Sequence, residues 1–148
     1  YNHVLKDNNW EQLKFVLFNG DAFFMPRAYD PKSYFGAEAI SDHRKMFRIL
    51  HENVEAFTSA NVEPLIPTFI PGTFVNQFVA DNSVIWTVFN ANYRTIKGKL
   101  LEIDNHPKSQ YVDLWNGAPI TISKTGKTVS LVVEIGPRDV ACISEIAP

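Results

Sequence analysis

The pattern of hydrophobic and polar positions changes near residue 61. Before that point, the nearly continuous apolar run Leu13–Phe18 is typical of a β-strand buried on both faces, as in a parallel sheet. Further along, the spacing predicts one helix from about Ala37 to Thr58. The apolar stripe of this helix consists of Ile40, Phe47, Leu50, Val54 and Phe57. The first part therefore predicts a single strand–loop–helix unit.

From residue 62 onward, short β-rich runs alternate with turn residues about every ten positions, which predicts an antiparallel β-sandwich of about seven strands. The alternation is clearest in Thr128–Ile135, where Val129, Leu131, Val133 and Ile135 share one face. Just before it, Lys124–Lys127 predicts a hairpin turn in which glycine supplies the positive φ angle. The expected strands are Phe74–Ala80, Val84–Phe89, Thr95–Ile103, Gln110–Trp115, Pro119–Ile122, Thr128–Ile135 and Asp139–Ile146.

The chain is expected to divide into residues 1–61, a last βα unit with the start of a proline-rich linker, and residues 62–148, the sandwich. A lone βα unit cannot bury its own strand, and the 148 residues supply no other strand of that kind. The chain also begins with Tyr1 rather than methionine. We therefore expect the end of a longer protein, in which the predicted strand Leu13–Phe18 finds neighbours. Without them, this strand could pair between two copies of the chain.

Composition and charge narrow the function classes. The chain has 14 Lys and Arg against 16 Asp and Glu, so no basic excess favours nucleic acid as a partner. No apolar run approaches the ~20 residues of a membrane span. Cys142 is the one cysteine, which excludes an internal disulfide and a cysteine-based zinc site and predicts a buried small hydrophobic residue. The compartment stays open, and a secreted or periplasmic location is compatible with these features.

Four phrases of the sequence resemble the C-terminal end of large glycoside hydrolases. They are Phe18–Phe24, Val84–Asn90, Thr95–Gly98 and Tyr111–Gly117, in this order along the chain. In those enzymes a (β/α)-barrel catalytic domain is followed by an antiparallel β-sandwich. The resemblance covers most of the chain. It implies that Leu13–Phe18 corresponds to the final barrel strand and that the helix after it is the last barrel helix.

The barrel resemblance also implies candidate substrate-binding residues. In barrel enzymes, binding groups follow the C-terminal ends of the strands, and here that position is held by Asn19 and Asp21. The other interpretation is that both residues only build a turn. The aromatic residues of Ala22–Gly36 could stack on sugar rings or pack in the interior, and Arg27 could face the pocket.

No pair of carboxyl groups in this chain predicts a catalytic site, although a glycosidase needs two of them roughly 5–10 Å apart. Glu52 and Glu55 are expected on a solvated helix face, and Asp113 is expected to tie down a neighbouring turn. Trp86 and Trp115 are expected in the core, with a sugar-binding platform as the alternative. We predict no cofactor and no metal site. The nearest histidines on one helix, at positions 43 and 51, are separated by about 12 Å of helical rise.

Three functions remain open at this point. The favoured one is the C-terminal region of a carbohydrate-active barrel enzyme, whose sandwich supports the catalytic domain and which is inactive alone, with carbohydrate as the partner of the whole enzyme. The second is a non-catalytic carbohydrate-binding module. The third is an interaction or assembly domain.

Overall fold

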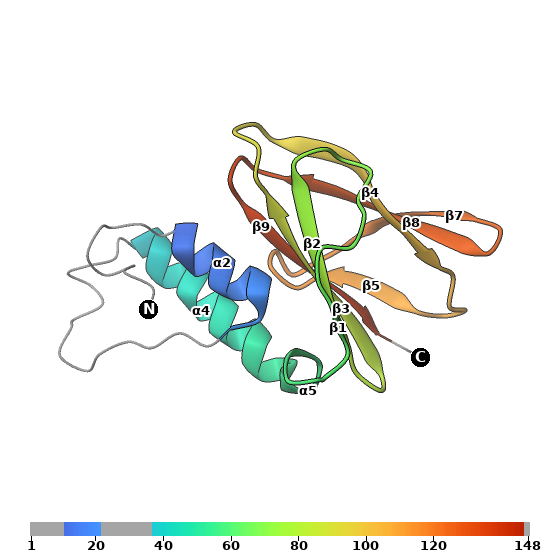
Figure 1. The fold of residues 1–148 in the computed structure, drawn as a ribbon, viewed down its shortest axis with the longest axis horizontal. Coiled ribbons are helices and arrows are strands. Elements are labelled where there is room, and N and C mark those ends of the chain that lie inside the picture. The colour runs from blue at the N-terminus through green and yellow to red at the C-terminus, as the bar shows by residue number, and fades with distance from the viewer. Residues whose placement is uncertain (1–10, 22–36, 147–148) are drawn as a thin grey trace.

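The computed structural model describes residues 11–21 and 37–146, which form an antiparallel β-sandwich with helices on one side (Figure 1). The helices are α2 (Glu11–Asn19), α4 (Ala37–Glu52) and the short α5 (Val54–Phe57). No helix among these residues is long and apolar enough to cross a bilayer.

Nine strands in the described residues form two sheets. The larger sheet has six strands in the order β1-β2-β3-β9-β5-β6, and the smaller has three in the order β4-β8-β7; every pairing is antiparallel. The strand bounds are β1 Val62–Glu63, β2 Thr73–Val79, β3 Ser83–Asn90, β4 Ile96–Asp104, β5 Gln110–Asp113, β6 Ala118–Pro119, β7 Thr121–Thr125, β8 Thr128–Ile135 and β9 Val140–Ile146. The predicted mainly β, antiparallel sandwich is confirmed.

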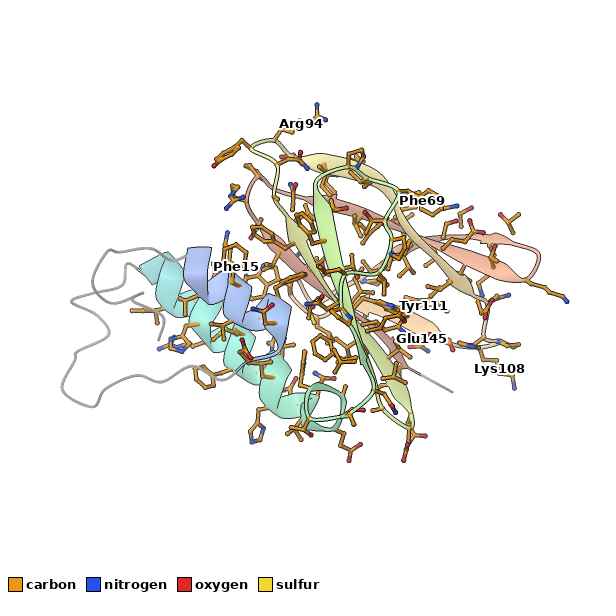
Figure 2. All side chains as sticks on the ribbon, in the orientation of Figure 1. Phe15, Phe69, Arg94, Lys108, Tyr111 and Glu145 are labelled. Atoms are coloured by element: carbon orange, nitrogen blue, oxygen red, sulfur yellow. The ribbon has the colours of Figure 1, made fainter. Side chains whose placement is uncertain are left out.

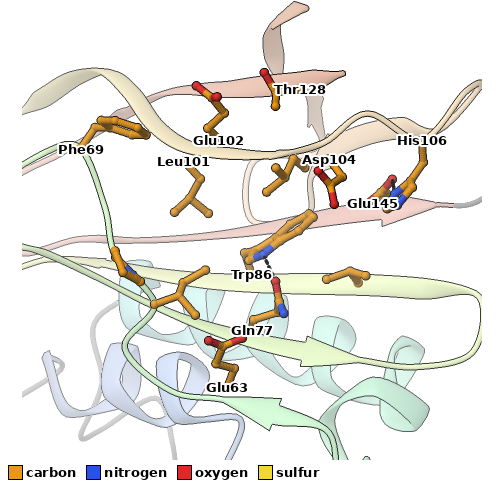
Figure 3. A pocket seen from close by; sticks show the side chains of 14 residues that line it. Glu63, Phe69, Gln77, Trp86, Leu101, Glu102, Asp104, His106, Thr128 and Glu145 are labelled. Atoms are coloured by element: carbon orange, nitrogen blue, oxygen red, sulfur yellow. Dashed lines mark hydrogen bonds and ion pairs between the residues drawn. The ribbon is translucent and has the colours of Figure 1, made fainter. Parts of the chain in front are cut away.

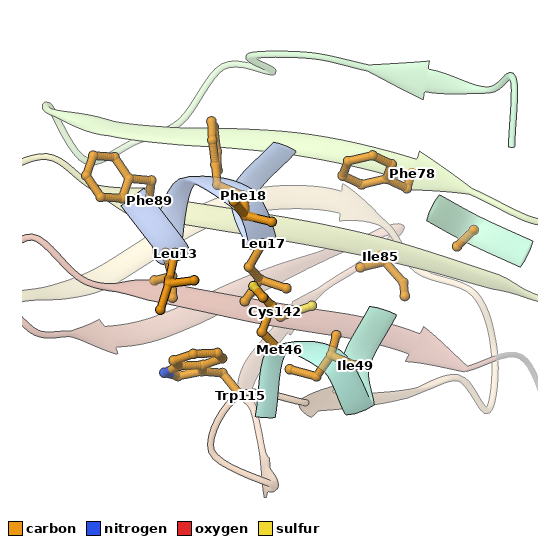
Figure 4. Close-up of a cluster of buried hydrophobic side chains, with 13 residues drawn as sticks. Leu13, Leu17, Phe18, Met46, Ile49, Phe78, Ile85, Phe89, Trp115 and Cys142 are labelled. Atoms are coloured by element: carbon orange, nitrogen blue, oxygen red, sulfur yellow. The ribbon is translucent and has the colours of Figure 1, made fainter. Parts of the chain in front are cut away.

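The central strands β3 and β9 of the six-stranded sheet are buried on both faces, because helices cover one face and the three-stranded sheet covers the other. Along β3, Ile85 and Phe89 join the cluster that α2, α4 and α5 cover, whereas Trp86 and Val88 point into the cluster between the sheets. Figure 4 shows the helix-side cluster, in which Leu17 and Met46 meet β-sheet residues. The molecule therefore has three layers, with the large sheet in the middle.

The strand predicted at Leu13–Phe18 is wrong: these residues lie in α2. An apolar run of this length fits a buried strand or a buried helix equally well, and only neighbouring elements decide between them. Leu13, Val16 and Leu17 are each at most 4% exposed and have the i, i+3, i+4 spacing of a helix face. A helix also satisfies its backbone groups without flanking strands. The strand edge proposed for self-association is thus not offered by these residues.

The helix predicted from Ala37 to Thr58 is confirmed, with a break at Asn53. There the side-chain Nδ2 donates to the carbonyl oxygen of Ile49 at 2.8 Å. The buried face differs from the predicted stripe, because Met46, Ile49 and Ala56 are buried while Phe47 and Val54 are 48% and 52% exposed.

The sandwich strands follow the prediction closely. The four apolar residues of β8 that share one face in the sequence are all buried between the sheets. Gly126, with φ of 62°, turns the chain between β7 and β8. The strand expected at Pro119–Ile122 is divided between β6 and β7, and β1 is an additional short strand. The division of the chain at residue 61 stays a prediction.

Candidate functional site between the two sheets

The predicted substrate-binding residues Asn19 and Asp21 lie at the C-terminal end of α2. The chain leaves the helix in a Schellman motif: the amide of Gly20 donates to the carbonyl oxygen of Leu17, and that of Asp21 to the carbonyl oxygen of Val16, both at 3.0 Å. Gly20 has φ of 68°, which favours glycine. Asn19 and Asp21 are exposed. Sugar binding by them stays a prediction, although the barrel strand on which it was based is a helix.

The last turn of α2 is joined to the sandwich by two buried hydrogen bonds. Phe18 O accepts from Asn76 Nδ2 at 2.9 Å and from Thr87 Oγ1 at 2.6 Å. These donors stand on β2 and β3, in the middle layer. Lys14, one turn earlier, pairs with Asp139 at 2.8 Å. The turn predicted to bind substrate thus adjoins the joint between the helices and the sandwich.

A pocket of about 690 Å³ is lined by residues of both the six-stranded and the three-stranded sheet (Figure 3). The segment before β2 bridges the two sheets there, because the amide of Ile66 donates to Val75 O and that of Phe69 to Leu100 O, both at 2.9 Å. Apolar side chains form part of the wall, and polar groups converge on it from both sheets. Its charged and imidazole side chains are Glu63, Glu102, Asp104, His106 and Glu145.

Glu145 is the most buried of these acids, at 4% exposure. Its Oε1 accepts a hydrogen bond from the Tyr111 hydroxyl at 3.1 Å and lies 2.8 Å from Nδ1 of His106. Figure 2 shows Tyr111 and Glu145 side by side. Burial, together with the neighbouring carboxylate, raises the pKa of Tyr111 to about 12. The phenol is therefore a neutral donor near neutral pH.

Both tryptophans considered in the sequence are core residues, as expected. Trp115 is 6% exposed in the helix-side cluster. Trp86 is 2% exposed, lines the pocket, and donates from its indole Nε1 to Gln77 Oε1 at 2.8 Å, the dashed contact in Figure 3. Neither ring offers an open face on which a sugar could stack. Phe23, Phe24, Phe35 and Arg27 lie outside the described residues.

The structural role predicted for Asp113 is confirmed. Its Oδ1 accepts from the backbone amides of Trp115 and Asn116 at 2.9 and 3.2 Å, and its Oδ2 accepts from the Asn116 side chain at 2.6 Å. Glu52 and Glu55 are exposed on their helices. Cys142 is fully buried and unpaired, and burial raises the pKa of its thiol. Among the described side chains, no three histidines, cysteines or acids are grouped to hold a metal ion.

The sequence analysis did not predict the acidic residues of the pocket as a site. One signal was available for Glu145: in the apolar run that ends the chain, it stands two positions after Ile143 and four after Ala141, so strand alternation places it on the face between the sheets. Glu63, Glu102, Asp104 and His106 give no such signal, because their meeting depends on how the two sheets stack.

No model of a known protein family matches the chain, and no curated protein matches it in sequence. Solved structures do match. An α-amylase from Anoxybacillus has a TM-score of 0.58 and 11% identity, and the match covers 94% of this chain and 32% of the enzyme. The cyclomaltodextrin glucanotransferase CldA has a TM-score of 0.63 and 9% identity over 98% of this chain and 34% of the enzyme.

A putative α-N-acetylgalactosaminidase from Bacillus halodurans also matches, with a TM-score of 0.55 and 9% identity over 100% of this chain and 34% of that protein. At such identities the likeness shows the fold alone. The chain spans about a third of the length of these structures. It has the fold of a β-sandwich region, with its preceding helices, in glycoside hydrolase-type proteins. The resemblance read from the sequence is confirmed at this level.

Proposed function

We propose that this chain is the C-terminal part of a carbohydrate-active barrel enzyme and that its sandwich supports the catalytic domain. The observation that carries the proposal is the extent of the structural match. It covers 94–100% of the chain, so α2, α4 and the sandwich occur together in the matched structures. A free-standing binding module would need only the sandwich.

The contacts between helices and sandwich fit a supporting role. Phe18 O, capped by Asn76 and Thr87, fixes the end of α2 on the middle sheet. The helices bury Leu17, Met46 and their neighbours against the same sheet. Buried hydrogen bonds inside a packed cluster hold one geometry, because the alternative leaves polar groups unsatisfied. Such a joint can transmit the rigidity of the sandwich to a domain that continues from the helices.

The surface of α4 gives a second argument. Its apolar side chains extend beyond the part that the sheet buries, since Phe47 is 48% exposed and stands next to buried Met46. Beyond the break at Asn53, Val54 of α5 is also exposed, at 52%. Large apolar side chains exposed on these helices offer a surface that another element can cover. A neighbouring helix of a barrel would cover it.

The test compares the isolated chain with the complete product of its gene. We expect the 148-residue chain to fold but to hydrolyse none of a panel of α- and β-linked oligosaccharides, because its sequence predicts no catalytic pair of carboxyl groups. We expect the complete product to contain repeated βα units before Tyr1 and to hydrolyse at least one of the panel. Hydrolysis by the isolated chain, or a gene without such units, would overturn the proposal.

A non-catalytic carbohydrate-binding module is the alternative function. Its sequence candidates, Trp86 and Trp115, are buried, and the exposed ring of Phe69 has Lys99 Nζ 4.2 Å above it. Calorimetric titration of the isolated chain with the same oligosaccharides decides between the two functions, since only the alternative predicts binding.

A further inference from the structure

The starting point is a carboxylate at a position where the sandwich calls for an apolar side chain. Glu145 stands on the face of β9 that looks toward the smaller sheet, in register with Val84 on one side and Tyr111 on the other. It is 4% exposed. Removing a carboxylate from water costs several kcal/mol unless partners compensate. A buried carboxylate is a local departure of the kind that occurs at functional sites.

Within the described residues, only one of the two carboxylate oxygens of Glu145 has hydrogen-bond partners. Both the Tyr111 hydroxyl and His106 Nδ1 lie within hydrogen-bond distance of Oε1. Oε2 accepts no hydrogen bond from the described residues, and the side chain lines the pocket. Tyr111 is neutral, and His106, whose side chain is 63% exposed, is charged only when protonated. Oε2 of Glu145 is therefore the oxygen that a group entering the pocket could reach.

The rest of the pocket contributes further acids. Glu63, Glu102 and Asp104 are exposed residues of its wall, and no lysine or arginine is among the residues that line it. Lys99 pairs with Glu102 and lies above the ring of Phe69, which lines the pocket, so it offsets the charge of Glu102. The exposed acids of the wall without an ion-pair partner in the described part of the chain are Glu63 and Asp104. Acids that share a concave, partly apolar wall raise the local negative potential, because the low dielectric focuses the field. Such a pocket favours a cation.

The shape and apolar lining limit the kind of cation. Trp86 and Leu101 form an apolar part of the wall near the acids (Figure 3), and Ile66 also lines the pocket. A bare metal ion is not favoured, since no three of the described acids and histidines are grouped to bind one. A volume of about 690 Å³ fits a small organic group.

We propose that this pocket binds an ammonium or guanidinium group carried on an apolar stem, with Glu145 as the innermost acceptor and Asp104 at the entrance. The charged group reaches Oε2 of Glu145 while the stem contacts the apolar wall. A free amine and a lysine or arginine side chain of a peptide share this chemistry. The inference is independent of the proposed enzyme function.

The Trp86 indole N–H is a built-in reporter for the test. Its ¹⁵N–¹H signal is one of three indole signals, and a Trp86→Phe variant assigns it. The isolated chain is titrated with phenethylamine and with its neutral counterpart 2-phenylethanol, at low salt and about pH 8, where histidine is largely neutral. A second arm compares the acetylated, amidated tripeptides Gly-Lys-Gly and Gly-Gln-Gly, which separates a peptide source from a free amine.

We expect phenethylamine to shift the Trp86 signal and 2-phenylethanol to shift it at least about tenfold more weakly. Salt should weaken amine binding, because it screens the charges. Glu145→Gln should reduce the affinity at least about tenfold, whereas Glu134→Gln, on the outer face of the small sheet, should leave it unchanged. If Glu145→Gln fails to fold, the pair Glu63→Gln and Asp104→Asn tests the negative charge of the pocket at exposed positions.

Three results would overturn the proposal. Equal shifts by the amine and the alcohol would show an apolar pocket without charge preference. Shifts by maltotriose but not by the amine or the Gly-Lys-Gly peptide would show a carbohydrate site. An unchanged Trp86 signal with both amines would show that neither cation enters the pocket.

Discussion

The hydroxyl of Thr87 donates a 2.6 Å hydrogen bond to the backbone oxygen of Phe18, 69 positions earlier in the chain. Both residues are buried, and the bond joins the last turn of a helix to the centre of a sheet. Asn76 donates to the same oxygen from the adjacent strand. One carbonyl group thus connects the helical layer to two strands of the middle layer.

Replacing Thr87 by valine keeps the shape and removes this bond. Because Asn76 still donates to Phe18 O, we expect a loss of about 1 kcal/mol in the free energy of unfolding. Urea denaturation followed by circular dichroism measures it. Thr121→Val, at an exposed position of β7, is the matched control and should change stability by less than about 0.5 kcal/mol. Equal effects of the two changes would contradict the importance of the bond.

Gly20→Ala should destabilise the chain through two separate causes. At φ of 68° an alanine costs about 1 kcal/mol in backbone strain, and its Cβ would lie 2.8 Å from Phe57 and 3.0 Å from Phe78. Gly117→Ala has almost the same φ, 67°, but open space around its Cβ. We therefore expect Gly117→Ala to cost about 1 kcal/mol and Gly20→Ala a further 1 kcal/mol or more from crowding. Identical melting temperatures would refute the crowding.

Asp113→Ala should loosen the turn after β5. The carboxylate accepts hydrogen bonds from the amides of Trp115 and Asn116, and these donors lose their partner when it is removed. A loss of about 1–3 kcal/mol is expected. Asp81→Ala, in the exposed turn between β2 and β3, serves as the control, with a change near zero. Amide hydrogen exchange at Trp115 and Asn116 should accelerate in the Asp113 variant.

The raised pKa of Tyr111 predicts a loss of stability in alkali. A tyrosine in the unfolded chain loses its proton near pH 10, whereas Tyr111 in the folded chain keeps it to about pH 12. Between these values the folded state binds more protons, so its stability falls as the pH rises. Below about pH 10 this contribution is fully present. Urea denaturation at increasing pH should show the decline.

Two phenylalanine variants isolate this effect. Tyr111→Phe should flatten the decline, while Tyr93→Phe, at an 86% exposed position, should leave it as in the parent chain. A decline that survives in the Tyr111 variant would assign the alkaline instability to other groups.

The strands were predictable from sequence because their alternation is a local property. In β8, side chains two residues apart share one face whatever else surrounds them. The helix at Leu13–Phe18 was not predictable in this way, since a short apolar run carries no period of its own and the sheet beneath it decides its form. The burial of Met46 rather than Phe47 was not predictable for the same reason. The sequence shows that one side of the helix is apolar, but not which residues of that side the sheet covers.

The pocket was even less accessible to sequence reading. Tyr111, His106 and Glu145 meet only because β9 runs beside β5 and the segment after β4 returns to them. The turn role of Asp113, by contrast, was predictable, because its partners follow it within three residues. Local chemistry could be read from the chain, and chemistry between distant strands could not.

The burial of the central strands of the middle sheet on both faces bears on how this protein is produced in the laboratory. Residues 62–148 contain all nine strands of the described part of the chain, so expression of this segment alone would be an obvious choice. Yet one side of that sheet would then present Phe78, Ile85 and Phe89 to water, where α2, α4 and α5 now cover them. The six-stranded sheet would then expose a large hydrophobic patch, which favours aggregation of the chain. The helices therefore keep the sheet soluble by covering its hydrophobic face. A protein sample that lacks the helices should precipitate.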